Sequence, residues 1–236
     1  MTDYRLYLES GPRRRKTMVH VLDLLGCSAQ GPTTEAALAA TPQAIRAYLA
    51  VLEQHGEPVD PQADFTTTVA QHVTEGNWLA NGDPTSGFVP DFEPLGADEL
   101  QVYIQRLDGL LDALLARTRG LSPARMASEP DGGGRPIDAI FRHIAGSQGV
   151  YLRYLVGKVD GLPELLKQAE TAEAGLLPLV LTRLWELCRA RLEVLTPEER
   201  SRSVPHGQLT WTARRALRRM LEHPWEHLAE ISRRLD

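Results

Sequence analysis

Three of the seven histidines are spaced in a way that could bind a metal ion. His223 and His227 lie four residues apart in a segment with helical periodicity, so both imidazoles leave the same face of a helix. They border the apolar arc of that helix rather than its solvent side. His143 lies on the inward flank of a second helical segment. If the two helices face each other, the three imidazoles meet at one end of a helical core.

This arrangement suits catalytic metal chemistry. Neutral imidazole is a good ligand for zinc, nickel, iron and copper. Three protein ligands leave coordination positions open, as in catalytic rather than structural sites, and such a position can activate water or hold a thiolate. The alternative is that His223 and His227 form only a polar helix edge with hydrogen-bonded rings. The third histidine, on another inward flank, favours the metal.

One proline lies between two of these histidines, and the other four histidines lie elsewhere in the chain. Pro224 stands between the two ligand positions of the last helix, where we expect it to kink the helix and splay the rings. The other four histidines fall in predicted strands or loops, and we expect no function for them; they are His20, His55, His72 and His206.

The first 75 residues alternate strand-like segments with one helix. Short runs rich in aromatic, β-branched and aliphatic residues predict strands at 4–8 and 17–22, a short edge element at 27–30 and a strand at 65–73. A helix is expected to start after Thr33, which is a suitable N-cap, and to end before Gly56. The predicted order is β-β-β-α-β, an α+β domain over residues 1–75.

Residues 97–236 show helical periodicity and predict an all-α four-helix bundle. The four predicted helices cover 98–119, 136–156, 176–195 and 210–235. Between the two parts, residues 76–96 are rich in glycine, proline and aspartate and predict a linker. We expect this linker to dock on a domain surface through Trp78, Phe88 and Phe92.

Composition excludes several classes of protein. Among 236 residues, 42% are hydrophobic and the formal net charge is −5, so the chain is globular and nucleic-acid binding is not expected. The basic residues between Arg214 and Arg219 are interpreted as a solvated helix face. No apolar run reaches the ~20 residues of a membrane span, and the N-terminus lacks the pattern of a signal peptide. Cys27 and Cys188 lie far apart and predict reduced thiols rather than a disulfide.

The C-terminal part resembles the DinB-like superfamily of metal-binding bundles over about residues 97–236. Two segments carry the resemblance, residues 136–146 (PIDAIFRHIAG) and 220–231 (MLEHPWEHLAEI). It implies that His143, His223 and His227 are the ligands of a divalent metal, zinc or nickel. The position five residues after the first ligand is often Glu in that family but is Gln148 here, which implies no acid–base role for it. Family members include transferases and isomerases that use low-molecular-weight thiols.

The N-terminal part resembles the HicB-like antitoxin domain, a partial RNase H-like fold. The resemblance covers about residues 1–75 and is carried by 24–38 (LLGCSAQGPTTEAAL) and 42–49 (PQAIRAYL). No paired carboxylates occur there, because Asp23 and Glu35 flank a turn and are expected to act in local capping. We therefore predict no nuclease activity. A toxin-like protein partner would fit this domain, but the bundle stands where a DNA-binding element is expected.

Together these features predict a bacterial, cytoplasmic enzyme that uses a divalent metal, and a low-molecular-weight thiol as cosubstrate, to act on a small molecule as a transferase or hydrolase. A homodimer is the expected assembly. The alternative is a non-catalytic regulatory protein, in which the N-terminal domain recognises a protein partner and the bundle is a scaffold.

Overall fold

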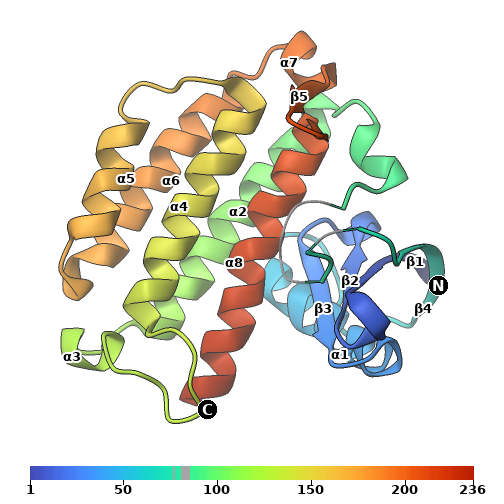
Figure 1. Cartoon of the computed structure of the whole chain (residues 1–236), viewed down its shortest axis with the longest axis horizontal. Helices are drawn as coiled ribbons and strands as arrows, with labels where there is room; N and C mark the ends of the chain where they lie inside the picture. Colours follow the sequence, from blue (N-terminus) through green and yellow to red (C-terminus); the bar gives the residue numbers. More distant parts are fainter. Residues whose placement is uncertain (77, 81–85) are drawn as a thin grey trace.

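The N-terminal part of the chain forms a four-stranded mixed sheet with one helix packed on it (Figure 1). The structure is a computed structural model, which describes all residues except 77 and 81–85. The strands are β1 (Thr2–Ser10), β2 (Thr17–Val21), β3 (Cys27–Gly31) and β4 (Phe65–Val73), and the helix is α1 (Thr34–Gln54).

The order of these elements agrees with the predicted β-β-β-α-β. The strands lie in the order β3-β2-β1-β4, in which β1 pairs antiparallel with β2 and parallel with β4. β3 is an edge strand, as predicted, and the hydroxyl of Thr33 accepts a hydrogen bond from the Ala36 amide to cap α1. Asp23 was expected to act in local capping, but it forms an ion pair with Arg5 of β1 instead.

Successive side chains of β1 and β2 point to opposite faces of the sheet, and both faces are buried here. Leu6 and Val19 belong to the apolar core that also contains Tyr48 of α1. Glu9 and His20 are buried as well, and the ring of Phe88 lies 5.1 Å from that of His20. The second face therefore carries buried polar groups, and these meet α8 of the bundle.

Four long helices form the bundle, and all four predicted helices are present. Neighbouring pairs are α2 with α8, α8 with α4, α4 with α6 and α6 with α2. Figure 1 shows that α8 runs between the other bundle helices and the N-terminal sheet. The helices are α2 (Ala97–Thr118), α4 (Ile137–Val156), α6 (Leu177–Glu193) and α8 (Ala213–Leu235).

Several elements were not predicted. α5 (Leu162–Thr171) packs against α4 and α6. The last helix does not start at Thr210, because a hairpin of β5 (Val204–His206) and β6 (Leu209–Trp211) precedes it and Thr212 caps α8. The short elements are η1 (Pro12–Arg14), η2 (Leu22–Leu24), η3 (Val89–Phe92), α3 (Pro123–Met126), η4 (Ala174–Leu176) and α7 (Pro197–Ser201).

The predicted linker docks through one of its three aromatic residues. Phe88 is fully buried, but Trp78 is 70% exposed and Phe92 is 48% exposed. Asp91 supplies a polar anchor, since its carboxylate is completely buried against the guanidinium of Arg218. The predicted linker also includes residues 77 and 81–85, which lie outside the described residues.

Three smaller expectations concern the cysteines, Pro224 and membrane-spanning helices. Cys27 and Cys188 are both free and buried, as predicted. α8 continues as one helix through Pro224, so the proline does not end it, and the expected kink stays a prediction. Among the described residues, every helix is too short or too polar to cross a membrane.

Candidate metal centre

The three predicted histidines converge where α4 and α8 pack together. Nε2 of His223 lies 3.0 Å from Nε2 of His143, and each histidine offers a ring nitrogen within 4.8 Å of those of the other two. The ring centroids are 4.6 to 5.4 Å apart and the rings meet edge to face. His223 and His227 are buried, whereas His143 is half-buried.

This donor set fits a divalent cation. Ligand nitrogens at 2.0–2.1 Å from a tetrahedral zinc ion stand about 3.4 Å apart, so small side-chain rotations would bring the three rings onto one ion. Three imidazoles would leave open coordination positions. Without a cation, two ring nitrogens 3.0 Å apart would repel each other unless one of them carries a hydrogen and donates it to the other.

The environment keeps these imidazoles neutral, which is the form that binds metals. Burial, followed by the charges of Arg135 and His227, lowers the pKa of His143 to about 4. Burial and the neighbouring His227 and Arg219 hold the pKa of His223 well below its usual value. Burial also lowers the pKa of His227, although its hydrogen bond to Glu230 opposes this shift.

Glu230 is a site residue that the sequence analysis missed. Its Oε2 accepts a hydrogen bond of 2.8 Å from Nδ1 of His227, which leaves Nε2 of that ring for a cation. Its other carboxylate oxygen bonds Arg234 one turn further along α8. Carboxylates commonly orient metal-binding histidines in this way. The signal was the three-residue spacing from His227.

Two residues near His143 have structural roles. Gln148 is buried, and its side-chain amide donates a hydrogen bond of 2.8 Å to the Met220 carbonyl, which links α4 to α8. Arg142 donates hydrogen bonds to the carbonyl groups at the end of α5, including those of Ala169 and Ala172. Neither contact gives these residues a part in proton transfer.

The basic cluster of α8 is not a solvated face, contrary to the prediction. Arg215, Arg218 and Arg219 are at most 2% exposed. Arg218 makes two parallel hydrogen bonds, of 2.8 and 2.9 Å, to the Asp91 carboxylate. Nη1 of Arg219 donates to Glu222 at 2.6 Å. The reason is that η3 brings the Asp91 carboxylate to this face, Glu222 of α8 supplies a second carboxylate, and His20 of β2 packs on it.

His20 also differs from its prediction, because it lies at the centre of this buried charge cluster. Its Nδ1 is 2.7 Å from Oε1 of Glu222, and its Nε2 is 3.4 Å from Oε1 of Glu9. Burial opposes protonation of His20, but Glu222 and Glu9 outweigh it and raise its pKa to about 9. His20 is therefore a buried cation that joins β2 to α8.

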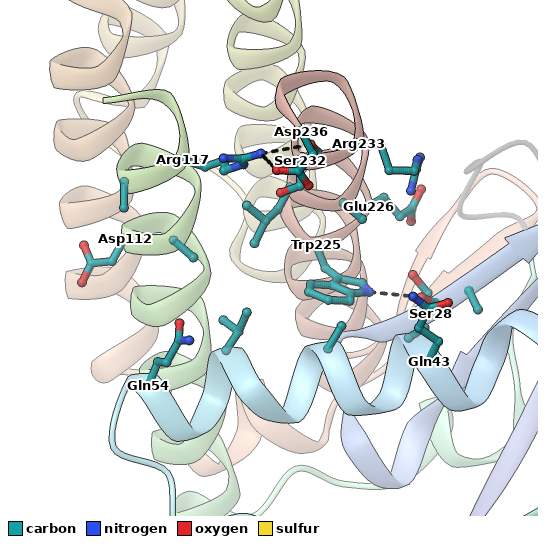
Figure 2. A pocket seen from close by; sticks show the side chains of 18 of the residues that line it. Ser28, Gln43, Gln54, Asp112, Arg117, Trp225, Glu226, Ser232, Arg233 and Asp236 are labelled. Atoms are coloured by element: carbon teal, nitrogen blue, oxygen red, sulfur yellow. Dashed lines mark hydrogen bonds and ion pairs between the residues drawn. The ribbon is translucent and has the colours of Figure 1, made fainter. Parts of the chain in front are cut away.

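A wide groove of about 1460 Å³ lies on another face of α8, between this helix, α1 and α2. Figure 2 shows Trp225 in this groove, with its indole N–H directed at Ser28, and Arg117 directed at Ser232 and Asp236. None of the three clustered histidines lines it. Trp225 stands between the two α8 histidines in sequence, so one helix turn faces both the cluster and the N-terminal sheet.

Comparison with protein families identifies the superfamily of the chain. The family model described as the DinB superfamily matches residues 106–231, more than half of the chain, and the chain belongs to this superfamily. A similar solved structure is YfiT from Bacillus subtilis, described as a probable metal-dependent hydrolase with an unusual four-helix bundle topology. It is 22% identical over 60% of this chain and 90% of its own, with a TM-score of 0.47. No curated protein matches the chain.

Proposed function

We propose that this protein is a metal-dependent enzyme that acts on a small molecule, with a divalent cation held by His143, His223 and His227. The convergence of the three neutral imidazoles carries the proposal. Zinc or nickel suits this donor set. When bound, the cation would supply a Lewis acid with open positions that activates water or a thiol.

The chain's own groups would prepare this site. Glu230 fixes the tautomer and orientation of His227. Burial and the nearby cations keep the imidazoles unprotonated at neutral pH. His143 also lines a cavity of about 430 Å³, which would give a small molecule access to the cluster. These features support hydrolysis, or transfer with a low-molecular-weight thiol as cosubstrate, as the reaction class.

The test is a screen of zinc- and nickel-loaded protein for ester and amide hydrolysis and for thiol transfer. Turnover should require the metal and disappear in each of the His143→Ala, His223→Ala and His227→Ala variants. His55→Ala is the matched control, since this histidine hydrogen-bonds Val51 at the end of α1 and should leave turnover intact. Full activity of His223→Ala would contradict the proposal.

The N-terminal sheet supports a second candidate, recognition of a protein partner. β4 is an edge strand, and residues 66–70 of it are all exposed. Exposed edges can pair with a strand of another chain, either a second copy in a homodimer or a toxin-like protein. Association that disappears when Val69 is changed to Lys would favour this role.

The family match begins at residue 106, so the HicB-like and RNase H-like assignments and the domain limits of 1–75, 76–96 and 97–236 stay predictions.

A further inference from the structure

A cavity of about 430 Å³ opens beside His143 along one face of α4. α4 contributes Gly146, Ser147, Val150, Tyr151 and Tyr154 to its lining, at the spacing of successive helical turns. The opposite wall comes from Leu209 and Trp211 of the hairpin strand β6. The volume lies in the range of small-molecule sites, which is about 300–1,000 Å³.

Gly146 indicates that this space is kept open. A glycine inside a helix destabilises it relative to alanine, so a packing reason is expected. Gly109 and Gly149 have such a reason, because a Cβ at either position would lie 2.9 Å or less from the side chains of His55 or Leu166. A Cβ on Gly146 would meet no described atom within 4 Å. Close packing therefore explains Gly109 and Gly149. Gly146 has no such contact, and we attribute it to the open space beside His143.

The hairpin wall is aromatic and firmly held. The ring of Trp211 is fully buried, and its centroid lies 4.7 Å from that of Tyr154 and 5.8 Å from that of Tyr151. The guanidinium carbon of Arg215 lies 5.0 Å from the Trp211 ring centroid. Tyr151 in turn lies 6.3 Å from the ring of His223. A continuous aromatic series thus runs from the histidine cluster to the hairpin.

The chemistry of the lining indicates what would bind. Apart from His143, the described residues of the cavity carry no ionisable group other than the tyrosine hydroxyls. Because Trp211 is fully buried behind this wall, a bound ring would pack on the half-buried side chains of Val150, Tyr154 and Leu209. An uncharged, apolar lining excludes a charged group. The ligand part that fits here is an uncharged planar ring.

We propose that this cavity is the substrate subsite for an aromatic group, attached to an oxygen or sulfur function that reaches the cation. This rests on the proposed function, because it presupposes the metal at His143, His223 and His227. Gly146 and the β6 hairpin would then determine substrate class: aromatic substrates are accepted, and bulk at position 146 excludes them.

The test compares two probes that share a chelating group. Zinc affinity is measured first by calorimetry, and the zinc-loaded protein is then titrated with benzohydroxamate and with acetohydroxamate. Burial of the phenyl ring should make benzohydroxamate bind roughly 10- to 100-fold more tightly. In Gly146→Leu that preference should fall to within about threefold, with zinc affinity unchanged. Arg153→Leu is the control, because it adds a leucine to an exposed position of α4 and should keep the preference.

The outcomes separate the two proposals. Failure of the wild-type protein to bind zinc overturns the proposed function and the subsite with it. Zinc binding with equal affinity for both probes overturns the subsite alone, as does an unchanged preference in Gly146→Leu. If Gly146→Leu does not fold, Gly146→Ala replaces it, and at least a threefold loss of preference is then expected.

Discussion

Two histidine environments lie on different sides of α8, and they shift the pKa of their imidazoles in opposite directions. His20 is enclosed by Glu9 and Glu222, which raise its pKa to about 9 and keep it a cation. On the other side, His143 and His223 face each other, and the pKa of each is lowered.

The comparison shows that the neighbours, rather than the residue type, decide what a buried histidine does. Glu222 and His223 are adjacent in sequence, yet a rotation of about 100° per residue directs them to different sites. Glu222 fastens the N-terminal sheet to α8, while His223 joins the candidate metal centre. We interpret the first site as structural, and the second as the metal centre of the proposed function.

The largest expected effect is on stability, at the structural site. His20→Ala leaves the buried Glu9 carboxylate without its cation and removes one of the three cations around Glu222, and this should lower the free energy of unfolding by about 3–5 kcal/mol. Urea denaturation measures the loss. The control is Arg5→Ala at the exposed ion pair with Asp23, where the loss should be below about 1 kcal/mol. A similar, small loss for both variants would refute the structural role of His20.

The same site should have a characteristic pH dependence. Because the pKa of His20 is raised above its unfolded value of 6.5, its stabilisation is fully present below pH 6.5 and is lost as the pH rises through about 9. The groups facing it are Glu9 from β1 and Glu222 and Arg218 from α8. The difference in unfolding free energy between wild type and His20→Gln, on the order of 3 kcal/mol at its largest, should shrink over this interval. A difference that grows with pH would be inconsistent with a charged His20.

A smaller effect is expected at the candidate metal centre. Glu230→Gln weakens the acceptor that orients His227, and it should reduce zinc affinity roughly 10- to 100-fold. Calorimetry of the zinc complex measures this change. Glu164→Gln on the exposed side of α5 is the matched control and should leave affinity unchanged. Equal affinity of Glu230→Gln and wild type would remove Glu230 from the site.

The smallest expected effect concerns the cavity beside His143. Gly146→Ala should stabilise the protein by about 0.5–1 kcal/mol, because alanine favours the helix and its methyl group meets no described atom. Gly149→Ala should destabilise it instead, since its Cβ would lie 2.8 Å from the Leu166 side chain. Thermal unfolding of both variants gives the signs, and stabilisation by Gly149→Ala or destabilisation by Gly146→Ala would contradict this account.

Local patterns in the sequence predicted most of the fold. Periodicity located the four strands of the N-terminal sheet and the four long helices, and Thr33 was identified as the cap of α1. The β5–β6 hairpin was missed because Thr210 and Trp211 directly precede α8 and extend its apolar pattern. α5, a helix of ten residues, was missed as well.

The candidate site was predicted where it depends on local spacing, and missed where it depends on distant parts of the chain. Helical spacing and the DinB-like motifs indicated the three histidines, and the structure brings them together. The burial of Arg218 and His20 could not be predicted, because their partners Asp91 and Glu222 are more than 100 residues away in sequence. Long-range contacts of this kind depend on how the sheet docks on α8.

The central claim is that His143, His223 and His227 share one cation, and metal content tests it most directly. Protein purified without a metal-affinity step should contain, or take up from zinc at micromolar concentration, one divalent ion per chain. His223→Ala should retain less than about a tenth of this, while His55→Ala retains all of it. A wild-type protein that binds no divalent metal, or a His223→Ala variant that binds it equally well, would contradict the account.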